Sequence, residues 1–174
     1  MSSRSAYAHH IRALPPALRG MATLGFSEEA CLAGTGITSQ DLSSEQAEAQ
    51  FTLEKEFSFH RRLLQLSDDP LLGLTLGKTY TLETYGLFGY AFLSAATLRQ
   101  ALMVAQNFWL LSYTLSKMQL AVRGNTAAFS FTPTIAVPAD LVQYYTDRDA
   151  AAVALAGELA LGESLPVQRV TLGH

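Results

Sequence analysis

Residues 84–102 read TYGLFGYAFLSAATLRQAL, and this stretch decides how the rest of the chain is interpreted. It places two glycines, Gly86 and Gly89, among aromatic side chains, and its first charged residue is Arg99. Residues three apart share a face of a helix, and each glycine inside a helix costs about 1 kcal/mol relative to alanine. We therefore predict a helix in which both glycines permit close packing. The neighbour is either a second element or a ligand, and the sequence leaves both open.

The residues after this stretch predict one long helix and a small antiparallel sheet. Thr97 and Gln100 form a capping box, which predicts a helix over residues 98–113. Apolar and polar residues then alternate on both sides of a Gly-Asn turn, which predicts a β-hairpin over residues 117–132. A further strand is predicted over residues 166–172.

Helices are also predicted on both sides of this region. Polar residues that favour the first position of a helix, and prolines that suit its first turn, mark their beginnings. These markers are Pro15-Pro16, Ser27, Thr52 before a helix at 53–66, and Asp140 before a helix ending at Leu161. Helices flanking a small antiparallel sheet indicate the α+β class. We expect residues 1–174 to form one domain.

The composition indicates a folded protein that does not itself bind nucleic acid. The chain has 174 residues, of which 49% are hydrophobic and 16% charged, and its net charge is −3. Such a composition favours a buried core over disorder. A duplex-binding protein commonly neutralises about 6–10 phosphates with clustered Lys and Arg. The densest basic stretch in this sequence is only His60-Arg61-Arg62.

The sequence predicts a cytoplasmic protein without a membrane segment. Cys31 is its single cysteine, so an internal disulfide cannot form, as suits a reducing compartment. The N-terminal residues do not show the basic start and apolar block of a signal peptide. The chain's uncharged stretches, such as residues 84–98, are all shorter than the roughly 20 residues that span a bilayer.

The sequence contains no recognisable catalytic, cofactor or metal motif. The sequence has no Gly-x-Gly-x-x-Gly, no phosphate-binding loop and no Gly-x-Ser-x-Gly. His9 and His10 are adjacent and cannot chelate one ion as an i, i+4 pair does. Cys31 lies beside acidic residues, which raise a thiol pKa, so we interpret it as a core residue. We expect no enzymatic activity, no cofactor and no bound metal.

Several short motifs together resemble those of one known family. They are Asp-Pro-x-x-Gly-Leu-x-x-Gly at 69–77, Gly-x-x-Gly-Tyr at 86–90 and Ser-x-x-Thr-Leu-x-x-Ala-Leu at 94–102, with weaker matches at 33–37 and 41–42. This pattern resembles the N-terminal regulatory domain of AraC-type transcriptional regulators. The subgroup is the one with an arabinose-binding-type sensor domain, related to the ornithine-utilisation regulators.

The resemblance implies a sensor that binds a small-molecule effector and forms a homodimer. In such regulators DNA is bound by a C-terminal domain with two helix-turn-helix units. We expect residues 1–174 to be the regulatory domain alone, a fragment without that DNA-binding domain. The alternative is an interaction module that only dimerises and binds no ligand.

The candidate ligand-binding residues are aromatic side chains and one arginine. Aromatic rings would pack against the body of an effector, and the arginine would bind a carboxylate through two hydrogen bonds. For each residue the alternative is an ordinary core or surface position, and for the arginine it is an Asp on its own helix. The candidates are Tyr90, Phe108, Trp109, Tyr113, Tyr144 and Arg148.

Overall fold

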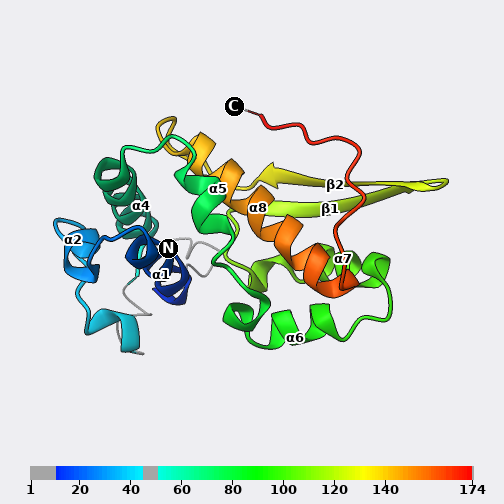
Figure 1. Cartoon of the computed structure of the whole chain (residues 1–174), viewed down its shortest axis with the longest axis horizontal. Coiled ribbons are helices and arrows are strands. Elements are labelled where there is room, and N and C mark those ends of the chain that lie inside the picture. The colour runs from blue at the N-terminus through cyan, green and yellow to red at the C-terminus, as the bar shows by residue number, and fades with distance from the viewer. Residues whose placement is uncertain (1–10, 45–50, 174) are drawn as a thin grey trace, which may run out of the picture. The chain divides into compact units, whose positions relative to one another are not determined.

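The computed structural model describes residues 11–44 and 51–173, and it divides into two units at the Asp69-Pro70 bond (Figure 1). The local sequence explains a break at this point. Asp68 adopts a left-handed conformation, with φ of 50°, and ends the preceding helix. Pro70 then disfavours a helical conformation at the residue before it. The expectation of one domain over residues 1–174 stays a prediction.

In the described residues of the first unit, helices joined by turns and loops are the regular secondary structure. Its elements are η1 (Ile11–Ala13), α1 (Leu14–Thr23), α2 (Glu28–Leu32), η2 (Asp41–Ser43) and α4 (Leu53–Ser67). The caps predicted at Ser27 and Thr52 are confirmed, because their side chains accept hydrogen bonds from the amides of Ala30 and Lys55. The expectation for His9 and His10 lies outside the described residues.

Cys31 is fully buried in the first unit, which confirms its interpretation as a core residue. Burial raises the pKa of the thiol, and the nearby Glu28 carboxylate raises it further, while Arg62 opposes both. Burial is therefore the main reason for an unreactive thiol, and the acidic neighbours considered in the sequence contribute less.

The second unit combines helices with one two-stranded antiparallel sheet, so the α+β class is confirmed. Its elements are α5 (Leu72–Gly77), η3 (Leu82–Tyr85), α6 (Leu87–Leu93), α7 (Leu98–Asn107), η4 (Trp109–Leu111), β1 (Ser116–Arg123), β2 (Thr126–Pro133) and α8 (Val142–Leu161). The strands pair in register from Ser116 opposite Pro133 to Arg123 opposite Thr126, as the predicted hairpin requires. An apolar cluster of this unit contains Leu82, Phe88, Phe92, Ala101, Ala105 and Met118.

Helices α5 and α8 pack closely because two glycines lie between them (Figure 1). A Cβ atom added at Gly73 would lie 2.5 Å from the carbonyl oxygen of Tyr144. One added at Gly77 would lie 2.4 Å from the carbonyl oxygen of Arg148. The glycines of the motif at 69–77 thus bring the backbone of α5 against the turn of α8 that carries Arg148.

Gly86 and Gly89 occupy different environments. Gly86 precedes α6 with φ of 54° and ψ of −129°, and nothing would touch a Cβ added there within 4 Å. The close packing expected at Gly86 is therefore corrected: this glycine provides a backbone conformation that L side chains rarely adopt. Gly89 is buried inside α6, and a Cβ added there would lie 1.9 Å from the carbonyl oxygen of Leu82 in η3.

The strand predicted over residues 166–172 is wrong. These residues contain no strand, and the side chains of Val167 and Val170 are 57% and 67% exposed. A strand is stabilised by backbone hydrogen bonds to a neighbouring strand, and in the described residues the sheet of this unit contains only β1 and β2. The alternating pattern of residues 166–172 does not reveal whether a neighbouring strand is present to pair with them.

Two predicted helix boundaries also need correction. The helix predicted over 98–113 ends at Asn107, and a short 3-10 turn follows. The Ser112 hydroxyl donates to the carbonyl of Trp109 at 2.6 Å, a local bond of the kind that competes with helix continuation. At α8 the capping position is Leu141, not Asp140, and the helix has no side-chain cap.

We expect Thr97→Ala to lower the stability of the second unit by about 1 kcal/mol, because it removes the cap of α7. The Thr97 hydroxyl oxygen accepts the amide hydrogen of Gln100 at 3.2 Å, and that amide has no partner inside the helix. The melting temperature should fall by about 2–4 °C. Thr97→Ser keeps the acceptor and serves as the control. Equal melting of all three proteins would contradict the prediction.

Candidate functional site

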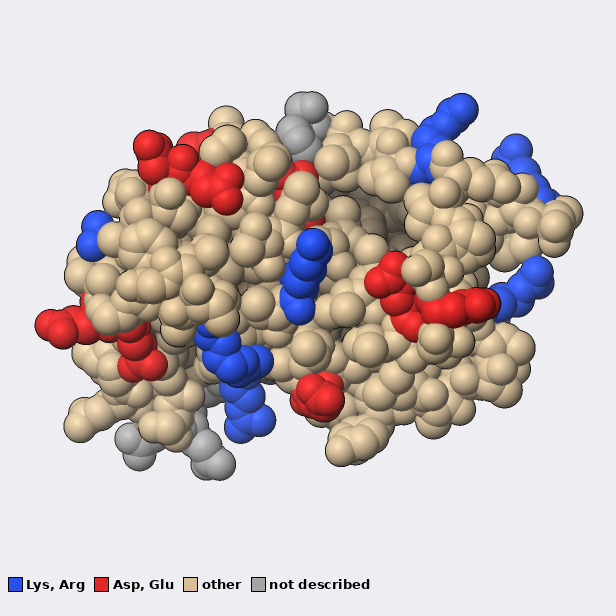
Figure 2. Space-filling model, viewed as in Figure 1, with Lys and Arg blue, Asp and Glu red and all other residues tan. Residues whose placement is uncertain are grey.

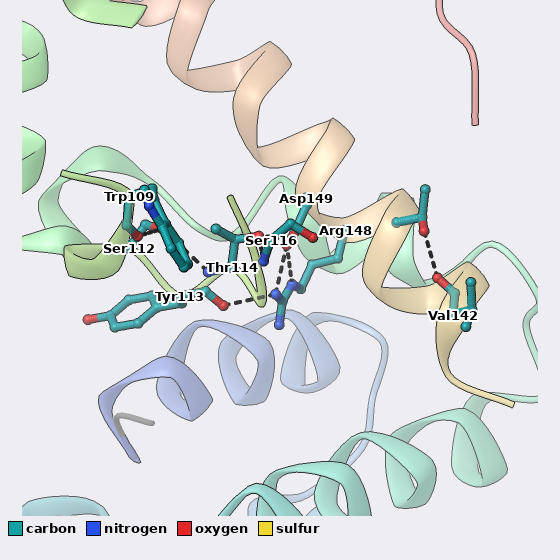
Figure 3. Close-up of polar contacts among 9 residues, drawn as sticks. Trp109, Ser112, Tyr113, Thr114, Ser116, Val142, Arg148 and Asp149 are labelled. Carbon is teal, nitrogen blue, oxygen red and sulfur yellow. Dashed lines mark hydrogen bonds and ion pairs between the residues drawn. The ribbon is translucent and has the colours of Figure 1, made fainter. Parts of the chain in front are cut away.

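A polar centre forms where α8 meets the residues that lead into β1 (Figure 3). Arg148 is only 2% exposed, and its Nε and Nη2 atoms donate to Asp149 Oδ1 at 2.9 and 2.7 Å. Nη2 also donates to the carbonyl oxygen of Tyr113 at 3.0 Å. Charge-assisted bonds of this kind are stronger than those between neutral groups. Arg148 is therefore paired with an Asp of its own helix, the alternative considered from the sequence.

The second oxygen of Asp149 binds the segment before β1. Thr114 donates its hydroxyl hydrogen to Asp149 Oδ2, and its own oxygen accepts the amide hydrogen of Ser116 at 3.1 Å. Both carboxylate oxygens are thus occupied from within the second unit. The result is a fixed connection between α8 and the first residue of the hairpin.

Arg148 stays charged in this environment. Burial lowers the pKa of its guanidinium, but Asp149 and the surrounding tyrosines raise it, and the net pKa lies well above its usual value. The guanidinium carbon also lies 4.6 Å from the centre of the Tyr145 ring and 5.3 Å from that of Tyr80, which are cation–π distances. Its Nη1 atom points away from Asp149 and has no hydrogen-bond partner among the described residues (Figure 3).

Aromatic rings line the side of the site nearest η3. Tyr85 and Tyr113 are stacked, with ring centres 4.9 Å apart and an angle of 25° between the rings, and Tyr80 meets Tyr113 edge-on. The hydroxyl of Tyr113 donates to the carbonyl of Thr84 at 2.7 Å. Burial raises the pKa of Tyr85, so its phenol is neutral at physiological pH. The rings therefore form an uncharged wall beside the ion pair.

These groups border a small, partly open cavity. The volume that the centre of a water molecule can occupy inside it is about 20 Å³. A cavity of this size holds about one water. An effector the size of an amino acid or a sugar therefore needs side chains to move before it can enter. The cavity is lined by Tyr80, Tyr85, Ser112, Tyr113, Thr114, Met118, Phe131, Arg148, Asp149, Ala152 and Val153.

The structure places two of the six candidate residues, Tyr113 and Arg148, at this cavity. The other four do not line it. Tyr90 and Phe108 are 71% and 54% exposed, Trp109 is half-buried against the apolar cluster of the second unit, and Tyr144 is buried with its ring edge-on to Tyr145. A role in ligand binding stays a prediction for each of the six.

Tyr80, Tyr85 and Asp149 line the cavity but are not among the six candidate residues. An Asp of the same helix was the alternative partner considered for Arg148, but adjacent helical residues do not usually face each other, so spacing did not single out Asp149. No sequence pattern placed Tyr80 and Tyr85 beside the helix that carries Arg148. Their meeting with α8 depends on contacts between segments more than 60 positions apart, which residue spacing does not encode.

Metal centres, membrane segments and nucleic-acid interfaces are the other kinds of site that bear on function. Across the described part of the chain, no three or more His, Cys, Asp or Glu residues are grouped so as to hold a metal ion. No described helix is both long and apolar enough to cross a bilayer. On the face shown in Figure 2, Lys and Arg side chains occur in small separate groups among acidic and uncharged residues. This face has no continuous basic patch of the kind that duplex binding uses.

Residues 25–174 match the family model of the arabinose-binding domain of AraC transcription regulators, a domain at the N-terminus of those proteins. The chain belongs to this family. The resemblance stated from the motifs at 69–77, 86–90 and 94–102 is therefore confirmed. AraC-type proteins are transcription regulators and not enzymes, so the family assignment also supports the expectation of a non-catalytic domain.

Two mycobacterial proteins are similar to this AraC-type chain. Both are named uncharacterized HTH-type transcriptional regulators, one from Mycobacterium bovis and one from Mycobacterium tuberculosis. Each is 30% identical over 122 residues, which cover 70% of this chain and 35% of the relative. The matched region thus spans about a third of the length of these relatives. No solved structure matches the chain.

Proposed function

We propose that this domain is the effector sensor of an AraC-type transcription regulator. It binds a small molecule and forms a homodimer in the cytoplasm, and through both it controls how a helix-turn-helix domain binds DNA. The family match over residues 25–174 carries this proposal. The names of the two mycobacterial relatives, which are HTH-type regulators, support the connection to DNA.

The arrangement of the second unit supports a role in signalling. Three elements meet at one cavity: α8 through Arg148 and Asp149, the start of the hairpin through Thr114, and η3 through Tyr85. A ligand shifts a conformational equilibrium only by binding one state more tightly than another. A molecule in this cavity would contact all three elements and would so favour one arrangement of them.

A domain that only dimerises is the second candidate. The cavity has room for about one water, and two large apolar side chains of α6, Leu87 and Tyr90, are strongly exposed. Exposed apolar residues that gather on one surface are typical of protein interfaces. This candidate requires dimerisation and predicts no response to any small molecule.

Thermal unfolding with a panel of metabolites distinguishes the two candidates. We expect one class among amino acids, polyamines, sugars and fatty acids to stabilise the domain, by about 2.7 kcal/mol at 100 times its Kd. That corresponds to a rise in melting temperature of about 5–10 °C for a protein of this size. No response to the whole panel would favour the module that only dimerises. Sedimentation of a monomer, with and without ligand, would contradict the homodimer in both candidates.

A further inference from the structure

We propose that the cavity beside Tyr113 is the effector site and that it accepts a small, uncharged molecule with one flat ring. The ring takes the place of the Tyr85 side chain on the face of Tyr113. This inference rests on the proposed sensing function and adds to it a location and a ligand class. It differs from the sequence-based expectation, in which Arg148 would bind the carboxylate of an effector.

The charges around the cavity favour a neutral ligand. The Arg148 cation is already matched by Asp149, at 2.7 Å, so the pair is neutral as a whole. An anionic ligand would leave two negative groups against one guanidinium in a buried place, and an uncompensated buried charge is costly. A cationic ligand would meet the opposite problem, because Arg148 would then be the second positive charge. An uncharged molecule disturbs neither partner.

The hydrogen-bonding groups at the cavity disfavour a polyol. Ser112 and Thr114 are its two aliphatic hydroxyl side chains, and both donor hydrogens are used, one by the carbonyl of Trp109 and one by Asp149. Their oxygens also accept the amide hydrogens of Thr114 and Ser116. The phenol hydrogen of Tyr113 is likewise donated to the carbonyl of Thr84. A sugar would bring many hydroxyls to a wall with few free partners, and buried polar groups without partners are destabilising. Met118, Phe131, Ala152 and Val153 complete an apolar lining.

The space for a ring is already present but is occupied by Tyr85. Its side chain stacks on Tyr113 at 4.9 Å, the spacing of a bound aromatic molecule, and is only half-buried. The Tyr85 ring also meets Phe88 edge-on, with ring centres 5.8 Å apart, and packs against the apolar cluster, so the ligand must compensate for these contacts when the ring moves. Outward rotation of the Tyr85 side chain would expose the face of Tyr113 and enlarge the water-sized cavity to the size of a ring.

Benzyl alcohol and benzoate test the charge preference, because they share a ring and differ mainly in charge. Calorimetric titration of the whole chain should show benzyl alcohol binding about tenfold or more tightly than benzoate, a difference of about 1.4 kcal/mol. L-Arabinose, as the polyol, should show no binding in the same concentration range. Equal or tighter binding of benzoate or of arabinose overturns the proposal. So does the absence of binding by benzyl alcohol, whereas the sensing function stands if a different metabolite raises the melting temperature.

Two variants locate the effect at this cavity, with folding checked by circular dichroism. Asp149→Asn frees the Arg148 charge and should shift the preference toward benzoate by about tenfold. Glu158→Gln is the matched control, because it removes one carboxylate charge from an exposed position of the same helix away from the cavity, so the preference should stay that of the unmodified chain. Tyr85→Ala removes the ring that the ligand must displace and should tighten benzyl alcohol binding by about threefold or more. An unchanged preference in Asp149→Asn, or unchanged or weaker binding in Tyr85→Ala, overturns the proposal.

Discussion

Replacement of Gly89 by alanine is expected to destabilise the second unit by about 3 kcal/mol or more. The added methyl carbon would lie 1.9 Å from the carbonyl oxygen of Leu82, far inside contact distance. That oxygen belongs to backbone, so a small rotation of a side chain cannot relieve the overlap, and η3 must move away from α6. Leu82 is itself buried in the apolar cluster with Phe88 and Phe92, and the movement would disturb that packing.

The sign of the Gly89→Ala effect makes the test decisive. At a solvent-exposed helix position, alanine would be more stable than glycine by about 1 kcal/mol. Packing and helix propensity therefore predict opposite changes in the melting temperature. Thermal unfolding should show a fall of about 6–12 °C. Ala91→Leu, two residues along the same helix at an exposed position, is the control and should change stability little. A Gly89→Ala protein that melts at or above the temperature of the unmodified chain would show that η3 does not pack against α6.

Replacement of Gly77 by alanine is expected to have the second large effect, a loss of about 2–3 kcal/mol. The new methyl carbon would lie 2.4 Å from the carbonyl oxygen of Arg148 and 2.7 Å from the Cβ atom of Ala151. Helix α5 would be forced away from α8 at the turn that carries Arg148 and Asp149. Because this turn holds the ion pair at the cavity, we expect the response to any ligand of the cavity to weaken together with stability.

The control for Gly77→Ala is Thr75→Ala in the same helix. Thr75 is exposed, and its replacement should change the free energy of unfolding by no more than about 0.5 kcal/mol. Chemical denaturation of the two variants measures the difference directly. Equal stability of the two variants would contradict the close contact between α5 and α8.

The parts of the fold that depend on neighbouring residues were predictable. Caps at Ser27, Thr52 and Thr97 lie where the side-chain chemistry places them, since each hydroxyl reaches an amide only three residues away. The hairpin register follows from alternation on both sides of its turn. The predicted strand at 166–172 failed for the opposite reason, because a strand needs a distant partner.

The candidate site was only partly predictable. Tyr113 and Arg148 were chosen from residue type and do line the cavity. Four other candidates do not, because an aromatic residue in an amphipathic segment can face the core, the solvent or a cavity. Which one it faces is decided by how helices pack against each other. For Arg148 the sequence left two partners open, an effector carboxylate or an Asp of its own helix, and the structure pairs it with Asp149, which changes the expected charge of a ligand.

Sequence alone determined the family, the α+β class, the first residues of several helices and the β-hairpin, because motifs, caps and turns act over a few residues. Tertiary structure decided that Gly89 lies against η3, that Gly77 brings α5 onto α8, and that the guanidinium of Arg148 is neutralised beside a wall of tyrosines. These features arise when segments far apart in the chain are brought together. The free energy of such contacts depends on the whole packed unit, so no local pattern of residues specifies them.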